Sequence, residues 1–320
     1  MPVLYQNNKD VPQDMLLGNM LFLNLVDMRV DESNLLNAFS MNNLPQHFVR
    51  KISKPDAFRR ASSSIKGETI DWEDSNGVFK AKVNVDEVVN SKDEIKRIVG
   101  VRVLNDALEE VYYRQIGTAQ FYRDTEVCNV SLNLPPDVTL LARGECSNLL
   151  DKIKNNYADW SVYHNKDTVK NTIKRVIDSM HPIALMPTGI CKFIPKEQTD
   201  TLYGLKGLLN DLSSFSTEHK ENTVEIIPII DTQEHRDLVE KQYQGEIKDT
   251  LYEYMQELTA IINTKQKLST RQVATYLTRY KELKSKIAEY ENLLGIYTQD
   301  IQQQLKYAIQ FIDDNKEEDA

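Results

Sequence analysis

Apolar side chains recur at alternating spacings of three and four residues near the C-terminal end of the chain, and this pattern strongly limits what that end can fold into. The mean spacing of 3.5 residues keeps one stripe on one side of a helix for four heptads, as in a helix that lies along another helix. A step of four and four follows at Tyr297, Ile301 and Leu305, and such a stutter locally unwinds a supercoil. The residues of the stripe are Val273, Tyr276, Tyr280, Leu283, Ile287, Tyr290, Leu294, Tyr297 and Ile301.

Two long helices joined by a short link are expected over residues 232–312. The first covers about 232–264, and the second begins at Ser269, which can cap the helix while Gln272 reaches back to it. The break near 265–268 is so short that it predicts an antiparallel hairpin. The second helix would be roughly 65 Å long. The acidic residues that follow are expected to fray beyond about residue 313, because negative charge is unfavourable at a helix C-terminus.

The first part of the chain, residues 1–145, has the pattern of an α+β domain. A strand is expected at Met20–Met28, and a short helix is expected to start at Pro55, a residue suited to the first helical position. Several β-rich runs then follow one another closely, and sequential neighbours of this kind usually pair as an antiparallel meander. The runs are Val78–Val85, Ile95–Leu104, Leu108–Ile116, Ala119–Glu126 and Val127–Leu134, with Asn105-Asp106 as a hairpin tip.

The middle part, residues 146–231, is expected to be a small α+β unit. It contains one helical pattern, a second one that Asp167 can cap, and two short strands, Ile183–Met186 and Ile190–Ile194. Helix, turn, helix and two-stranded ribbon is the order of a winged-helix module, although ordinary α+β domains share it. Pro228 lies inside a closing strand and argues for an edge position or a bulge in its sheet.

Composition and missing motifs argue against most chemical functions. The net charge of −9 disfavours a protein that coats nucleic acid by bulk charge. The three distant cysteines are typical of reduced thiols in the cytoplasm. Only Cys146, near a helix start, has a thiol pKa that a helix dipole could lower, and an inert buried thiol is the alternative.

Nucleotide-binding loops, metal-ligand spacings and nucleophile elbows are missing from the sequence. We therefore expect no catalytic residue, metal or cofactor. The N-terminus lacks a signal-peptide pattern, and its apolar run is too short to span a bilayer, so we expect a cytoplasmic protein without a membrane partner.

Two basic segments, 50–66 and 170–192, are the candidate contacts to nucleic acid. In the first, only Asp56 opposes the basic side chains, and Ser62–Ser64 offer donors to phosphate. In the second, basic side chains lie opposite the apolar stripe of a predicted helix. The alternative for both is a solvated surface that pairs with the protein's own carboxylates. The candidates are Arg50, Lys51, Arg59, Arg60, Lys170, Lys174, Arg175 and Lys192.

Two segments carry a resemblance to a known family. Pro55–Ala61 and Thr168–Pro195, which ends in Pro-Thr-Gly-Ile-Cys-Lys-Phe-Ile-Pro, resemble an uncharacterised family of bacteriophage and mobile-element proteins. The resemblance implies a cytoplasmic accessory protein of a phage or mobile element in a bacterial host cell. It implies no role for any residue.

Two functional hypotheses follow. The first is a non-enzymatic protein that binds a protein partner, or itself, through the C-terminal hairpin, and the second is a nucleic-acid-binding accessory protein. The tyrosine-rich stripe is either the seam of the hairpin or a wider groove that accepts a partner, because a tyrosine hydroxyl needs an outlet. The candidate interaction residues are Tyr276, Tyr280, Leu283, Ile287, Tyr290, Leu294, Tyr297 and Ile301.

Overall fold

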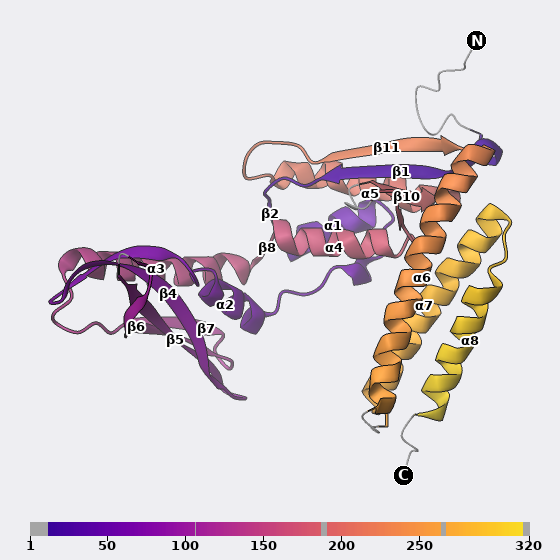
Figure 1. Cartoon of the computed structure of the whole chain (residues 1–320). Coiled ribbons are helices and arrows are strands. Elements are labelled where there is room, and N and C mark those ends of the chain that lie inside the picture. The colour runs from indigo at the N-terminus through magenta and orange to yellow at the C-terminus, as the bar shows by residue number, and fades with distance from the viewer. Residues whose placement is uncertain (1–11, 106, 187–190, 264–266, 316–320) are drawn as a thin grey trace. The chain divides into compact units, whose positions relative to one another are not determined.

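The computed structural model describes residues 12–105, 107–186, 191–263 and 267–315 (Figure 1). Its contacts divide the chain into two units, each of which collects segments that are distant in sequence. The meander unit comprises Asp27–Asn37 and Val49–Val169, and the bundle unit comprises Met1–Val26, Ala38–Phe48 and Lys170–Ala320. The three consecutive domains expected from the sequence, with boundaries at residues 145 and 231, remain a prediction about separate folding.

The meander unit is built on a five-stranded antiparallel sheet in which every strand pairs with its neighbour in sequence. This arrangement confirms the expected α+β class and the N-terminal antiparallel sheet. The expected runs Leu108–Ile116 and Ala119–Glu126 form one strand, and Asp106 lies outside the described residues. The strands are β3 (Thr69–Asp74), β4 (Gly77–Asn90), β5 (Glu94–Leu104), β6 (Glu110–Tyr122) and β7 (Val127–Leu132).

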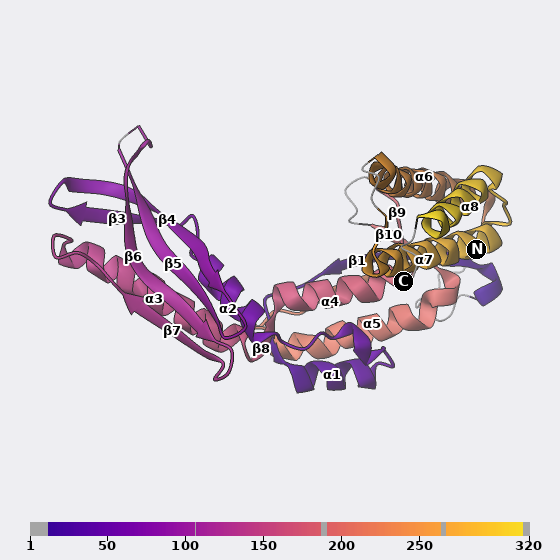
Figure 2. The same cartoon turned by 90° about the horizontal axis from the view of Figure 1, so that it is seen from below.

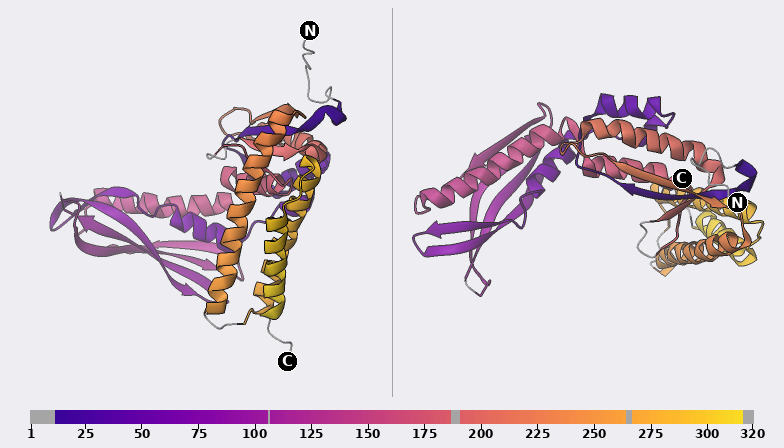
Figure 3. Two further views of the ribbon diagram at one scale, coloured as in Figure 1. Left: turned by 45° about the vertical axis from the view of Figure 1, so that its right-hand side comes forward. Right: turned by 90° about the horizontal axis from the view of Figure 1, so that it is seen from above.

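Two helices, α2 (Lys54–Ser63) and α3 (Leu140–Trp160), cover one face of this sheet (Figure 2 and Figure 3). Pro55 lies in the first turn of α2 as expected, and Ser53 caps that helix. Alternate residues of β4, such as Val83 and Val85, are buried against the helices, as expected for a sheet with one covered face. A short ribbon of β2 (Arg29–Asp31) and β8 (Tyr163–Asn165) completes the unit.

The bundle unit contains a four-stranded antiparallel sheet in the order β11-β1-β10-β9. Its strands are β1 (Leu16–Asn24), β9 (Ile183–Ala184), β10 (Lys192–Pro195) and β11 (Thr223–Ile230). β11 lies at the edge, which confirms the position inferred from Pro228. The two faces of β1 have different neighbours: the Asn19 amide donates to Thr199 Oγ1 (3.2 Å) at the start of α5 (Thr199–Leu212), and Met20 packs against the C-terminal helices. The sheet therefore lies between two helical layers.

The remaining short elements complete the chain order. The helices are α1 (Glu32–Met41), α4 (Lys166–Asp178) and α5 (Thr199–Leu212), and the 3-10 turns are η2 (Gln13–Met15), η3 (Gln46–Phe48), η4 (Lys196–Gln198) and η5 (Ser213–Phe215).

The expected winged-helix arrangement of the middle segment is wrong. The buried stripe of α3 packs into the core of the meander sheet instead of against α4. The ribbon of β9 and β10 pairs with β1, and Ile183 and Phe193 pack against the C-terminal helices. The helix α3 and the ribbon of β9 and β10 therefore bury their apolar side chains against other parts of the chain and not against each other.

Three helices, α6 (Gln233–Asn263), α7 (Thr270–Leu294) and α8 (Gln299–Asp314), form the C-terminal part of the bundle unit (Figure 1). The capping box that starts α7 is present: Ser269 Oγ accepts from the Gln272 backbone N–H (3.4 Å), and Gln272 Oε1 accepts from the Ser269 backbone N–H (3.0 Å). The expected break between the first two helices is confirmed, with residues 264–266 outside the described part.

The expected unbroken second helix to residue 312 is wrong. α7 ends at Leu294, because Gly295 adopts a left-handed conformation with φ +67° and caps the helix. The Glu291 carboxylate accepts from the Thr298 backbone N–H (2.8 Å) and from the Gln302 amide (2.8 Å), which fixes the turn into α8. The stutter in the apolar pattern thus coincides with a chain reversal. α8 ends at Asp314, and most of the tail that is expected to fray, residues 316–320, lies outside the described residues.

Candidate functional site

The predicted tyrosine-rich stripe lies mostly inside the C-terminal bundle. Leu283, Ile287, Tyr290, Leu294 and Ile301 are buried, and Tyr276 and Tyr280 are half-buried. Tyr297 follows the end of α7 and is 72% exposed. The stripe therefore forms a seam within the chain for most of its length, which matches the first of its two interpretations.

Two of the buried tyrosines, Tyr290 and Tyr254, donate their hydroxyls to backbone carbonyls of the chain, whereas the Tyr243 hydroxyl has no hydrogen-bond partner among the described residues. Tyr290 stacks on Tyr243 with ring centroids 5.1 Å apart, and its hydroxyl donates to the His181 carbonyl oxygen (2.8 Å). The Tyr254 hydroxyl donates to the Tyr276 carbonyl oxygen (2.8 Å). Burial raises the pKa of Tyr243 and of Tyr254 to about 12, so both remain neutral.

A polar cluster attaches α6 and α7 to the ribbon of β9 and β10. Lys286 Nζ donates to the Pro182 carbonyl oxygen (2.6 Å) and to Glu246 (2.7 Å), whose second oxygen accepts from the Ala184 backbone N–H (3.1 Å). These groups are hydrogen-bonded to one another within the unit. We assign them a structural role.

The surface of α6 that faces away from α7 and α8 is the candidate functional site. Leu238, Gly245 and Tyr252 follow one another there at intervals of seven residues, and Leu238 and Tyr252 are 44% and 65% exposed. We call this surface the outer face of α6. Its buried opposite side, which includes Tyr243 and Ile247, packs into the bundle core.

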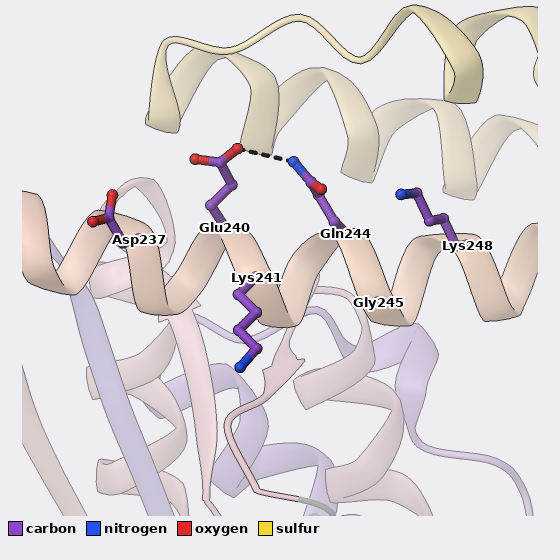
Figure 4. Close-up of a pocket in the computed structure, with 6 residues that line it drawn as sticks. All are labelled: Asp237, Glu240, Lys241, Gln244, Gly245 and Lys248. Carbon is purple, nitrogen blue, oxygen red and sulfur yellow. Dashed lines mark hydrogen bonds between the residues drawn. The ribbon is translucent and has the colours of Figure 1, made fainter.

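Two shallow hollows mark the outer face of α6. The first, of about 480 Å³, surrounds Gly245, and beside it the Gln244 amide donates to Glu240 (2.8 Å; Figure 4). The second has a volume of about 520 Å³. The linings are Asp237, Glu240, Lys241, Gln244, Gly245 and Lys248 for the first, and Tyr252, Met255, Gln256, Thr259 and Ala260 for the second.

Gly245 has no packing reason within the described chain. A glycine inside a helix is less stable than alanine by about 1 kcal/mol, and a Cβ at Gly245 would meet nothing within 4 Å. The glycines of α5 differ: a Cβ would lie 2.6 Å from the Asn42 carbonyl oxygen at Gly204 and 2.0 Å from Asn42 Oδ1 at Gly207. Gly204 and Gly207 therefore allow the chain around Asn42 to pack closely against α5, whereas Gly245 leaves open surface.

Two of the four basic candidates of the first segment, Arg59 and Arg60, have partners inside the meander unit. Arg59 contacts Asp56 (3.2 Å) and Glu87 (3.4 Å), and the Arg60 guanidinium lies 5.6 Å from the centroid of a Trp160 ring. Arg50 and Lys51 are exposed.

The serines expected to meet phosphate in this segment are also occupied. Arg97 donates to the Ser62 (3.0 Å) and Ser63 (2.6 Å) hydroxyls. The Ser64 hydroxyl donates to the Ala61 carbonyl oxygen (2.7 Å).

The second basic group belongs to the other unit. Lys170 and Lys174 are exposed on α4. Arg175 hydrogen-bonds back to its own helix at the Asn171 carbonyl oxygen (3.2 Å), and Lys192 is half-buried on β10. The structure therefore divides the eight basic candidates between two units.

The described residues offer little support for a reactive thiol, a metal site or a membrane-spanning helix. Cys146 is fully buried in the second turn of α3, and burial raises its pKa to about 12, so the helix does not activate this thiol. No three described His, Cys, Asp or Glu side chains gather closely enough to hold a metal ion. In the same part of the chain, no helix is long and apolar enough to cross a membrane.

Sequence reasoning missed the outer face of α6. The signal was present as the seven-residue repeat of Leu238, Gly245 and Tyr252, but the sequence marks Gly245 only as a weak point of the helix. The inner stripe of α6 is richer in apolar residues and dominates the pattern.

Comparison with known proteins gives one match. No curated protein and no solved structure matches the chain. A family model described as a family of unknown function (DUF6744) matches residues 16–316, from the first residue of β1 to just beyond α8. Because this match spans both units, the chain belongs to this family of unknown function.

Proposed function

We propose that this chain is a non-enzymatic interaction protein that assembles with protein through the outer face of α6. The observation that carries the proposal is the exposed repeat of Leu238, Gly245 and Tyr252 at the centre of that face. Such a repeat, with its two hollows, suits a helix laid along it, because exposed side chains on one helix can fill spaces beside a glycine on the next.

The tyrosine-rich stripe is not available to a partner, and this favours the outer face of α6 as the interaction surface. Ile287, Tyr290 and Ile301 are buried against other helices of the same chain, so a partner cannot reach them without opening the bundle. An assembly role for the C-terminal helices then falls to their outward surfaces. The resemblance of Pro55–Ala61 and Thr168–Pro195 to phage and mobile-element proteins supports an accessory role in such an element.

Site-specific photo-cross-linking tests the proposal. A benzophenone amino acid in place of Tyr252, in the full chain and in cells that carry it, should form a cross-link whose second peptide is identified by mass spectrometry. The matched control places the same amino acid at Ser285, which is exposed on α7. If the yield at residue 252 is no higher than at residue 285, in cells and in purified protein, the proposed surface is wrong.

Nucleic-acid binding is a second candidate, favoured by the exposure of Lys170 and Lys174 on the polar side of α4. Phosphate contacts by these lysines would release counterions, so affinity for labelled DNA or RNA should fall steeply with salt. Replacing both lysines by alanine should reduce the slope of log K against log salt by about 1.8 on duplex DNA. Replacement of Lys281 and Lys284 on α7 is the control, and failure to bind any nucleic acid at low salt ends this candidate.

A further inference from the structure

We infer that the partner of the outer face of α6 is a second copy of this chain, with the two α6 helices parallel and related by a two-fold axis. The inference rests on the proposed function and specifies it. In a two-fold interface the same surface meets itself. The arrangement of charges on α6 must therefore be complementary to itself.

The apolar centre of the face satisfies this condition. At 3.6 residues per turn, Leu238 and Tyr252 point within about 20° of the direction of Gly245. A parallel pair in register places Leu238 against Leu238, Gly245 against Gly245 and Tyr252 against Tyr252 of the second copy. The glycines allow the backbones to approach, and the exposed side chains on either side lose water-exposed apolar surface.

The charges are arranged by side. By the same helical geometry, Lys241 and Lys248 lie on one side of the central stripe, and Asp249 and Glu253 lie on the other. Among the described residues, none of the four has an ion-pair partner within the chain. Asp237 and Glu240 line the same hollow on the lysine side and are exceptions to the separation, and Glu240 accepts a hydrogen bond from the neighbouring Gln244 amide (2.8 Å).

This separation selects the parallel arrangement. A two-fold axis parallel to the helices brings the lysine side of one copy to the acidic side of the other. Lys248 then faces Asp249 of the second copy and lies five residues before its Glu253, the spacing of interhelical ion pairs in parallel coiled coils. An antiparallel pair centred on Gly245 would instead bring Lys248 beside Lys241 of the second copy, and like charges would repel.

Engineered cysteines test the partner and the orientation together. The native Cys128, Cys146 and Cys191 are buried, so mild oxidation of the full chain acts on an introduced, exposed thiol. We expect Leu238→Cys, Gly245→Cys and Tyr252→Cys each to form disulfide-linked dimers. Their yield should be roughly tenfold above that of Ser285→Cys, because association raises the effective thiol concentration to the millimolar range.

In an antiparallel pair, only Gly245→Cys would form a dimer with itself. Leu238→Cys and Tyr252→Cys would cross-link only when the two variants are mixed, because residue 238 of one copy would then face residue 252 of the other. That result would overturn the parallel arrangement. Control-level yields at all three positions, together with a monomer in sedimentation velocity at chain concentrations up to about 0.3 mM, would overturn the second copy as partner.

A charge reversal gives an independent test that needs no new cysteine. Lys248→Glu should weaken dimerisation of the parallel pair about fivefold, since two symmetric ion pairs become repulsive. Adding Glu253→Lys should restore much of the affinity. Tighter association of Lys248→Glu would indicate the antiparallel pair and contradict the inference.

The proposed function and this inference can fail separately. A chain that is monomeric in all these assays, but that cross-links through residue 252 to a different identified protein, retains the proposed function and refutes the second copy. A chain that gives no cross-link at residue 252 to any protein refutes both.

Discussion

Two glycines of the C-terminal helices should respond in opposite directions to the same substitution. Gly245 lies inside α6 with open space around it, so Gly245→Ala should raise the free energy of unfolding by about 1 kcal/mol through helix propensity. Gly295 has a φ of +67° at the end of α7, where a Cβ is unfavourable. Gly295→Ala should therefore lower the free energy of unfolding by about 1–2 kcal/mol.

Urea unfolding followed by far-ultraviolet circular dichroism measures both effects. With a denaturant dependence near 2 kcal/mol/M, each change corresponds to a midpoint shift of roughly 0.5 M or more, upward for Gly245→Ala and downward for Gly295→Ala. Trp72 and Trp160 both lie in the meander unit, so tryptophan fluorescence provides an internal control on the other unit. The chain should be dilute enough to be monomeric, because Gly245 also lies at the inferred interface.

The result that would refute this reasoning is a shift of the same sign in both variants. A stabilised Gly295→Ala variant would mean that α7 continues through residue 295, as the heptad pattern alone suggests. A destabilised Gly245→Ala variant in the monomer would mean that a neighbour closely contacts the outer face of α6 within one chain.

Three further predictions concern the ends of the helices and the acid stability of the bundle unit. The paired hydrogen bonds from Arg236 lower the pKa of Asp231, so the stability that this ion pair adds is fully present above the ordinary carboxylate pKa near 4 and is lost as pH falls below it, through the lowered pKa. Arg236→Ala should therefore flatten the acid limb of a plot of melting temperature against pH, and an unchanged limb would contradict this prediction. Ser269→Ala removes the capping box of α7 and should lower stability by about 1 kcal/mol in urea titrations, whereas a neutral effect would show that the cap is not needed. The backbone N–H of the buried Leu268 donates to the Asn315 carbonyl oxygen (2.8 Å), so a truncation that keeps Asn315 should leave the melting temperature unchanged, and one that ends three residues earlier should lower it.

Local signals in the sequence predicted the parts of the fold that depend on neighbours in the chain. Pro55 at the start of α2, the capping box at Ser269 and the closely spaced strands of the meander each act within a few residues, and each is present in the structure. Pro228 was informative for the same reason, because a missing backbone donor restricts a strand to an edge whatever its partner.

Predictions failed where distant segments compete for the same apolar surface. α3 and the ribbon of β9 and β10 are neighbours in sequence and look like one module. In the structure, α3 packs into the core around Phe58 and Phe121. The ribbon instead pairs with β1, which comes from near the N-terminal end of the chain. Gly295 is a different kind of failure, since the sequence marks both a stutter and a glycine there, and the choice between a bend and a reversal depends on how α8 packs against α6.

α6 carries two stripes, and their contrast explains the kind of association to expect. The inner stripe, with Tyr243, Ile247 and Leu251, is continuous and fully buried, and it stabilises the bundle unit itself. The outer stripe has only Leu238 and Tyr252 as large side chains around one glycine, so a pair of α6 helices buries little apolar surface. Interfaces of this size are typical of transient rather than obligate complexes. The monomer must therefore be stable without its partner, and assembly should respond to chain concentration and to salt.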